Sequence, residues 1–510
     1  MPSFGQDTSL PEYLRTEQER IERFAREAGL DFYPTVFEVL GFDQMNEVAA
    51  YGGFPTRYPH WRFGMEYERL AKSHEYGLSR IYEMVINNVP SVAYLLEGNS
   101  MVDQKLVMAH VFGHVDFFKN NYAFKATNQG KDAKDGSDVR KWIDTMANHG
   151  SVVRRWSHRI GIETVETFLD TCLAIENLID PNRPFRPKEV PEDRDRDVDD
   201  AEEPHLLRVE RDYMKGYINP ESFVESQRKK LADEKAKHKL RQPDPDRDVL
   251  GFLLDHAPLE RWENEILGIV RREAYYFLPQ MQTKIMNEGW ATFWHSRLMT
   301  TKIADGSEIV DYAERNAGVL ATSQGQLNPY KLGVELFRSI EDRWDRGQFG
   351  REWDSCDDAE ERRNWDRKTG LGASKVFEAR SVHTDVTFID EYLTPEFAIE
   401  NKLYAFGYNP RRDRFEIETR TFDDVKRKLL SQLTNAGQPV ISAIDANYHN
   451  RGELLLRHEH HGVDLRLDWA REVLTSLVRV WKRPVEIWTI VEKKPTAIRF
   501  DGKNHEQRPI

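Results

Sequence analysis

Two histidines four residues apart are the first residues in this sequence that could do chemistry. His110 and His114 lie in the mostly apolar run from Leu106 to Asn121. Residues four apart on a helix share one face, one turn apart, and two imidazole nitrogens placed in this way can bind one cation. The chain has 16 histidines in 510 residues, so about one chance pair at this spacing is expected in every two such chains. The pair alone is therefore weak support for a metal site.

A second segment strengthens the case for a metal site. Glu288 and His295 are seven residues apart, two helical turns along one face, among apolar neighbours. An ionised carboxylate in such surroundings needs a partner. We therefore expect His110, His114 and Glu288 to bind a divalent metal, most simply zinc, with His295 as a fourth ligand, a supporting partner or a catalytic group. The alternative is a set of hydrogen-bonded core groups that tie two helices together.

The segment Asn-Glu-Gly-Trp-Ala at 287–291 resembles the second zinc-binding helix of gluzincin-type metallopeptidases, in which a distant glutamate is the third ligand. Two histidines and one glutamate with an open fourth position form a catalytic zinc arrangement. Val111 stands where the first helix of those enzymes has the glutamate that activates water. Glu97 is our candidate for the missing catalytic base. Further candidates are His60, Glu66 and His149.

The elements that must position these residues are mainly helices. Apolar residues recur at helical spacing up to about residue 180, most clearly in Gln104–Asn120 and in Val152–Leu178, with a predicted break at Gly161. Residues 181–248 are rich in proline and charge and look like an insertion. Helical spacing resumes at Pro258. We therefore predict a helical body over residues 1–370.

The remainder, residues 371–510, changes character. Short β-rich runs alternate with turn residues, and two helices are expected between them. The predicted strands are Val386–Ile389, Leu403–Tyr408, Phe415–Glu418, Val440–Ala443, Glu453–Arg457 and Val485–Val491, and the predicted helices are Asp423–Leu433 and Asp468–Trp481. We predict a smaller α+β domain with a mainly antiparallel sheet, and an α+β fold for the whole chain. The histidines at 458, 460 and 461 are interpreted as a solvent-facing strand end rather than a metal site.

Composition limits the class of protein. The only cysteines, Cys172 and Cys356, are far apart in the sequence and do not indicate a disulfide-stapled fold. This is typical of a protein in a reducing compartment, so we expect a cytoplasmic protein. The apolar runs are too short to span a membrane, and the N-terminus lacks the apolar segment of a secretory signal. A formal charge of -13 disfavours binding to nucleic acid.

Several motifs, in order along most of the chain, resemble those of the SpoVR (stage V sporulation protein R) family. They are Tyr58–Tyr67, Tyr82–Asn88 with Tyr94–Asn99, His110–Asn121, Asn287–His295 and Asn328–Gly333. The resemblance implies a cytoplasmic protein that is linked in spore formers to the peptidoglycan cortex of the spore. In other organisms it implies a role in stress or stationary phase, alongside a PrkA-type serine kinase and a YeaH/YhbH-type protein.

Two functions follow from these observations. The first is a metal-dependent hydrolase-like protein that acts on cell-wall peptide or amide bonds of a peptidoglycan-related substrate. The second is a non-catalytic regulator or scaffold for the kinase and its companion, and Val111 favours it because losing the base usually costs the hydrolytic step.

Overall fold

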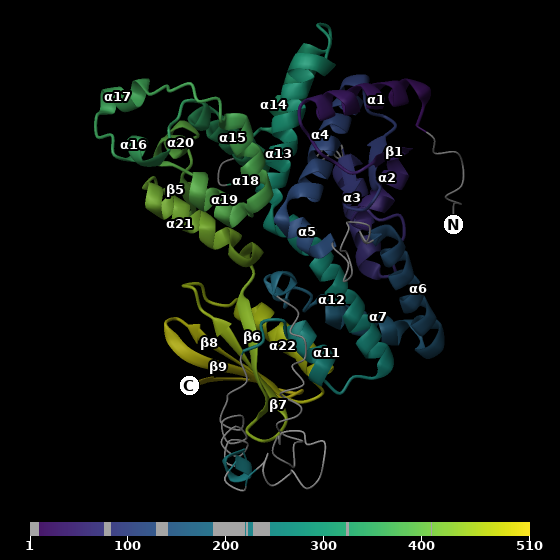
Figure 1. Cartoon of the computed structure of the whole chain (residues 1–510). Coiled ribbons are helices and arrows are strands. Elements are labelled where there is room, and N and C mark those ends of the chain that lie inside the picture. Colours follow the sequence, from purple (N-terminus) through teal and green to yellow (C-terminus); the bar gives the residue numbers. More distant parts are fainter. Residues whose placement is uncertain are drawn as a thin grey trace. The chain divides into compact units, whose positions relative to one another are not determined.

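The computed structural model divides the chain into two compact units. It describes residues 10–75, 83–128, 141–186, 220, 223–227, 245–322, 326–409 and 411–510 (Figure 1). The first unit comprises Met1–Asn177 and Glu260–Pro439, and the second comprises Leu178–Leu259 and Val440–Ile510. Residues 371–439, which we expected in the C-terminal domain, therefore belong to the first unit. The predicted boundary at residue 371 does not coincide with the division between the units.

The first unit is mainly helical, as predicted. Its longer helices are α1 (Glu12–Glu27), α2 (Phe42–Ala50), α3 (Trp61–Glu75), α4 (Met101–Asn120), α5 (Tyr122–Asn128), α6 (Trp142–Ile160), α7 (Ile162–Leu173), α12 (Arg261–Gln282), α13 (Lys284–Leu298), α14 (Ile309–Val319), α15 (Pro329–Asp345), α18 (Gly372–Val382), α19 (Asp385–Tyr392) and α21 (Phe422–Leu433). Shorter ones are α16 (Gly350–Asp354), α17 (Ala359–Asn364), α20 (Pro395–Glu400), the π-helix η3 (Met299–Ile303) and the 3-10 turn η4 (Thr434–Gly437). The predicted break at Gly161 is confirmed, because this glycine separates α6 from α7 with φ of 102°.

The first unit also contains a small sheet that helical spacing did not predict. Strand β3 (Ser91–Leu96) lies between β1 (Thr35–Leu40), to which it is parallel, and β2 (Glu83–Ile86), to which it is antiparallel. Phe37 of β1 packs on Phe112 of α4, with ring centroids 5.6 Å apart. The sheet therefore supports the helix that carries the histidine pair.

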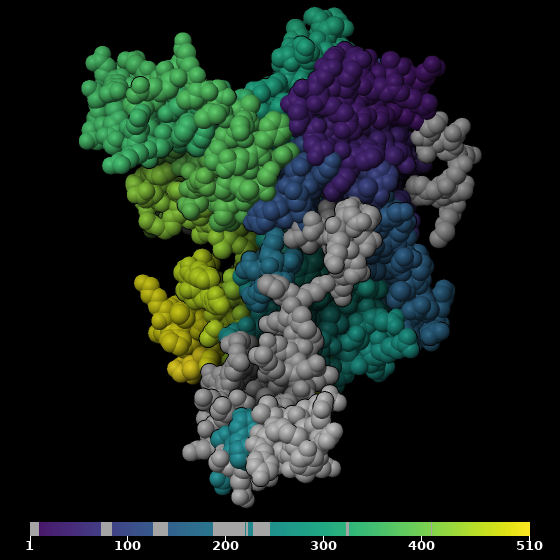
Figure 2. Space-filling view, viewed as in Figure 1, coloured from purple at the N-terminus to yellow at the C-terminus, as the bar shows by residue number. Residues whose placement is uncertain are grey.

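Helix α4 lies at the centre of this unit, and every residue from Val102 to Phe118 is buried. A helix that is apolar on all sides is expected to be surrounded by protein. Helices α1, α13 and α18 and strands β2 and β3 all contact α4. Figure 2 shows the N-terminal part of this unit, in purple and blue, beside residues of α15 to α21, in green.

Glycines let three of the helices approach closely. A Cβ atom at Gly113 of α4 would lie 2.7 Å from the Cα atom of Ala291 in α13. A Cβ atom at Gly289 of α13 would lie 2.4 Å from the Cα atom of Gly333 in α15. Any larger residue at these positions would push the helices apart. Because Gly113 precedes His114 and Gly289 follows Glu288, the close packing occurs at the candidate metal ligands.

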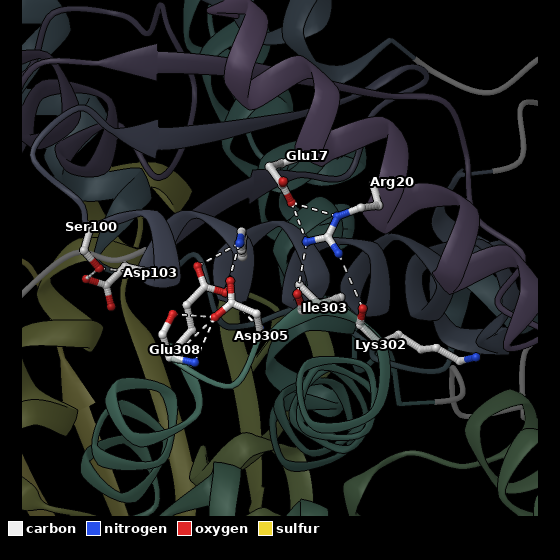
Figure 3. Close-up of polar contacts among 10 residues, drawn as sticks. Glu17, Arg20, Ser100, Asp103, Lys302, Ile303, Asp305 and Glu308 are labelled. Atoms are coloured by element: carbon white, nitrogen blue, oxygen red, sulfur yellow. Dashed lines mark hydrogen bonds and ion pairs between the residues drawn. The ribbon is translucent and has the colours of Figure 1, made fainter.

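Polar anchors fix the ends of α4 and α13. Figure 3 shows Arg20 of α1 beside the end of η3, where its guanidinium donates to the carbonyl oxygen of Ile303 at 3.0 Å. The ammonium of Lys105 in α4 lies 2.7 Å from the carboxylate of Glu308, which precedes α14. The side chain of Ser100 caps α4 by accepting a hydrogen bond from the backbone N–H of Asp103. These contacts hold the segment after α13 against α1 and α4.

The second unit is built on a five-stranded sheet in the order β10-β9-β8-β7-β6. The strands are β6 (Val440–Tyr448), β7 (Glu453–Glu459), β8 (Val485–Val491), β9 (Lys494–Phe500) and β10 (His505–Pro509). Strands β7 and β8 are parallel and the other neighbours are antiparallel, so the prediction of a mainly antiparallel sheet is confirmed. Helix α22 (Leu467–Trp481) makes the crossover between the parallel strands, and α11 (Val249–His256) contacts β6. The short η1 (Arg183–Phe185) precedes α11.

Most predicted elements after residue 371 are confirmed, with one error. Val386–Ile389 is part of helix α19 and not a strand. Thr384 and Thr387 form a capping box at the start of α19, and Phe388, Ile389 and Tyr392 are buried at helical spacing. The predicted strands near 403–408 and 415–418 form the hairpin β4 (Ala405–Asn409) and β5 (Arg414–Thr419) of the first unit. Most of the charged segment at 181–248 lies outside the described residues.

Among the described residues, every helix falls short of the length and apolarity that a membrane span requires.

Candidate metal centre

Helices α4 and α13 bring the three predicted ligands together. The Nε2 atoms of His110 and His114 lie 3.6 Å and 3.4 Å from Oε2 of Glu288. Ligand atoms from all three residues lie within 4.8 Å of one another. Ligands about 2.1 Å from a shared zinc ion in tetrahedral geometry are about 3.4 Å apart. The arrangement therefore fits a divalent cation in spacing and in ligand type.

The partners on the other side of each ring fix the tautomers of the histidines. Nδ1 of His114 lies 2.9 Å from the amide oxygen of Asn287. Nδ1 of His110 lies 2.8 Å from Nδ1 of His295, and Nε2 of His295 lies 3.2 Å from the amide oxygen of Asn316 in α14. An amide oxygen only accepts hydrogen bonds. His114 therefore donates from Nδ1 to Asn287. His295 donates from Nε2 to Asn316, so its Nδ1 accepts from Nδ1–H of His110. Neutral His110 and His114 thus carry their protons on Nδ1 and turn Nε2 lone pairs toward the carboxylate.

The pKa of Glu288 describes the other state of the metal-free site, in which the imidazoles donate to the carboxylate from Nε2 or carry a positive charge. Burial by itself raises the pKa of Glu288, but hydrogen bonds and charge from His110 and His114 outweigh burial and lower the pKa to about 2. The group is therefore an anion at neutral pH. Two neutral imidazole lone pairs facing an anion repel it, and a cation between them removes the repulsion.

The start of α13 is held by a carboxylate that the sequence did not point to. Asp385 of α19 accepts the backbone N–H groups of Ile285 and Met286 at 2.8 Å and 2.9 Å. Burial raises the pKa of Asp385 to about 7, against the lowering effect of these hydrogen bonds. Asp385 therefore satisfies two of the open donors at the helix N-terminus, one turn before Glu288.

A second buried carboxylate joins α4 to α13 and α18. Asp116 accepts the indole N–H of Trp290 at 2.8 Å and lies 2.5 Å from the guanidinium of Arg380. It also accepts the backbone N–H of Asp31 at 2.7 Å. Burial is the main influence on Asp116 and raises its pKa, while Arg380 opposes this rise. Asp116 thus fixes the relative position of the two helices that carry the candidate ligands.

Glu97 is not brought to this cluster. It is exposed in the turn between β3 and α4, and α4 begins nine residues before His110, about 13 Å along the helix axis. Its proposed role as the catalytic base is therefore not supported by its position. His295 lies beside His110, as expected of a supporting partner.

The other predicted candidates have separate partners. His149 Nδ1 is 2.8 Å from the carboxylate of Glu273, and His60 Nε2 is 3.1 Å from that of Asp170. Glu66 forms an ion pair with Arg69 on α3. These three candidates make their described contacts with groups outside the metal cluster.

The interpretation of the β7 histidines is wrong for His458. This side chain is buried, and its Nδ1 lies 2.9 Å from the hydroxyl of Thr489 in β8. His461 is exposed, as predicted. His458 is buried because the inward face of β7, which also carries Leu454 and Leu456, continues to this position.

Comparison with known proteins identifies the family of this chain. Residues 8–438 match the family described as "SpoVR like protein". The chain belongs to the SpoVR family. The match ends at residue 438, and the first structural unit ends at Pro439. The C-terminal end of the SpoVR match thus lies next to the C-terminal end of the unit that holds the candidate metal centre.

A relative in Escherichia coli (strain K12) covers more of the chain. The "Uncharacterized protein YcgB" is 30% identical over 495 residues, which cover 90% of this chain and 88% of the relative. The similarity to this SpoVR relative therefore extends into the second unit. No solved structure matches the chain.

Proposed function

We propose that this SpoVR protein binds one divalent metal ion, zinc in the first place, through His110, His114 and Glu288. The observation that carries the proposal is the spacing of 3.4 Å and 3.6 Å between the carboxylate and the two imidazole nitrogens. The acceptors on the Nδ1 sides support it, because they leave the Nε2 lone pairs available to a cation.

The function that follows from such a centre is hydrolase-like. A bound divalent ion polarises a carbonyl group and lowers the pKa of a bound water molecule. The side chain of Glu288 is 18% exposed, whereas its Oε2 atom and Nε2 of His110 are buried, so a substrate needs a local opening to reach the centre. We propose peptide or amide bonds of a peptidoglycan-related substrate as the target, in keeping with the link of the family to cell-wall building and to stress physiology.

One observation favours a second function, that of a non-catalytic regulator. Val111 stands in place of the usual base, and Glu97 lies at the far end of α4. Without a nearby base the hydrolytic step usually loses much of its rate, whereas a bound metal ion still holds α4 and α13 together. In that case the protein is a cytoplasmic scaffold whose partners are a PrkA-type kinase and a YeaH/YhbH-type protein.

Metal content tests the shared part of both functions. Full-length protein purified without a histidine tag is dialysed and analysed for zinc, manganese and iron, beside the double variant His110→Ala, Glu288→Ala. The matched control is the double variant His461→Ala, Glu459→Ala, which removes the same two residue types from an exposed strand end. We expect close to one metal ion per chain in the wild type and the control. Equal trace amounts in all three proteins would refute the proposal.

Product analysis separates the two functions. Metal-loaded protein is incubated with muropeptides, and the products are measured by mass spectrometry. Cleavage that is lost in the His110→Ala, Glu288→Ala variant supports the hydrolase. Unchanged substrate with zinc, manganese and iron, together with full metal content, supports the regulator.

A further inference from the structure

A groove in the first unit is not part of the metal centre. It has a volume of about 790 Å³ and lies among the start of α15, the α20 region, the hairpin β4–β5 and helix α21. Figure 1 labels α15, α20, β5 and α21. Its floor is apolar and includes the buried side chains of Leu332, Phe397 and Leu429. Its volume is in the range of clefts that bind small molecules or short peptide segments.

The charge of the groove is opposite to that of the chain. Four cationic side chains line it, Lys331, Lys402, Arg414 and Lys428, against the single carboxylate of Glu416. This gives +4 - 1 = +3 in a chain with a formal charge of -13. The lining is therefore a local site of attraction for anions on an acidic protein.

Among the described residues, two of these cations form no ion pair. Arg414 pairs with Glu416 at 3.0 Å, and Lys428 pairs with Glu418 at 2.7 Å. Within the described part of the chain, neither Lys331 nor Lys402 takes part in an ion pair. Their ammonium groups are therefore available to carboxylates from outside the chain.

The wall of the groove has the periodicity of an extended strand. Phe415 and Ile417 alternate on β5, both line the groove, and they are 48% and 41% exposed. Leu327, which lies two residues before the start of α15, is 44% exposed and also lines the groove. Large apolar side chains that stay exposed around a concave site mark a binding surface. In the described residues β5 pairs only with β4, so its other edge has backbone groups for a further strand.

We propose that this groove binds an acidic, extended peptide segment of a partner protein. Carboxylates of the segment pair with Lys331 and Lys402, and its apolar side chains cover Phe415 and Ile417. The two-residue period of β5 matches the alternation of side chains in an extended peptide, which a lipid chain does not have. The inference does not depend on the metal centre, because none of the three metal ligands lines the groove.

Fluorescence polarisation with full-length protein tests this proposal. The probe is a fluorescein-labelled eight-residue peptide of alternating glutamate and leucine, compared with a peptide in which glutamine replaces glutamate. We expect the acidic peptide to bind at least ~10-fold more tightly than the glutamine peptide, since two charge-assisted contacts are lost in the latter. The affinity should also fall as the salt concentration rises.

Matched charge reversals locate the site. The double variant Lys331→Glu, Lys402→Glu should bind the acidic peptide at least ~10-fold more weakly than the wild type. The control Lys493→Glu, Lys503→Glu makes the same change in charge on exposed turns of the second unit and should bind as the wild type does. Thermal unfolding and metal content of both variants should equal those of the wild type, which separates this site from the metal centre.

Three results would overturn the proposal. They are equal binding of the acidic and glutamine peptides, absence of binding by either peptide, and unchanged binding by the Lys331→Glu, Lys402→Glu variant. A fatty acid is the alternative occupant of the groove, and binding of dodecanoate, measured by calorimetry, tests it. Binding of dodecanoate without binding of the acidic peptide would assign the groove to a fatty acid instead.

Discussion

Replacing Asn287 tests whether the amide acceptors prepare the histidines for a metal. In the variant Asn287→Leu the side chain keeps its approximate size but loses the oxygen that accepts from Nδ1 of His114. The metal-free protein adapts, because His114 can move its proton to Nε2 and donate to Glu288. The metal-bound protein cannot, because Nε2 is then a ligand and the Nδ1–H stays buried without an acceptor.

The magnitude follows from that asymmetry. The side chain of His114 is 5% exposed, so water does not replace the lost acceptor. A buried donor without an acceptor costs about 1–3 kcal/mol. This cost falls on the metal-bound state alone, so zinc affinity should drop by about 5- to 150-fold. The range agrees with the roughly 10- to 100-fold losses seen when supporting partners of metal ligands are removed.

The assay is zinc competition against a chromophoric chelator at fixed pH, with thermal unfolding of each metal-free protein as the check on folding. Asn287→Asp is the matched variant, because its carboxylate still accepts from His114 and should keep the affinity within about threefold of the wild type. Our reasoning would be refuted by wild-type zinc affinity in Asn287→Leu, or by equal losses in both variants.

Three further predictions concern the packing and the second unit. Gly113→Ala places a methyl group 2.7 Å from the Cα atom of Ala291, so it should destabilise the protein by about 1–3 kcal/mol or more and weaken zinc binding; urea unfolding with wild-type stability would contradict this. Asp116→Ala leaves the guanidinium of Arg380 buried and unpaired, so unfolding in guanidinium chloride should show a loss of stability of about 3–5 kcal/mol. Adding Arg380→Met should recover part of this stability. A loss below about 1 kcal/mol would argue against the role of Asp116 in holding the helices together. Burial, with help from neighbouring histidines, lowers the pKa of His458 to about 4. The contribution of neutral His458 to stability is thus complete above its ordinary pKa of about 6.5, and about 1–3 kcal/mol of it is lost as the pH falls toward 4, after allowance for screening. His458→Gln should flatten this pH dependence. Identical pH profiles of unfolding for the variant and the wild type would exclude the effect.

The three residues of the candidate metal centre could be predicted because their signals are local. The spacing of His110 and His114 defines one helix face, and Glu288 stands out as a carboxylate in an apolar helix. The break at Gly161 was likewise visible, since glycine weakens a helix and allows the positive φ found there. What sequence spacing could not provide was the contact between α4 and α13, which the glycines at 113 and 289 permit.

The residues that sequence reasoning missed act through distant contacts. Asn316 lies 21 residues from His295 and Asp385 lies 100 residues from Ile285, and neither has a spacing that reveals its partner. The error at Val386–Ile389 has a similar origin, because β-branched residues favour a strand while the capping box of Thr384 and burial in the unit select a helix. Glu97 was chosen on residue type alone, and the fold places it outside the site.

Anomalous X-ray scattering at the zinc edge, from crystals of zinc-loaded protein, tests the central claim most directly. Our account predicts one strong peak within about 2.0–2.2 Å of Nε2 of His110, Nε2 of His114 and a carboxylate oxygen of Glu288. A zinc-loaded crystal with no peak between these three side chains, or with its peak elsewhere on the chain, would contradict it.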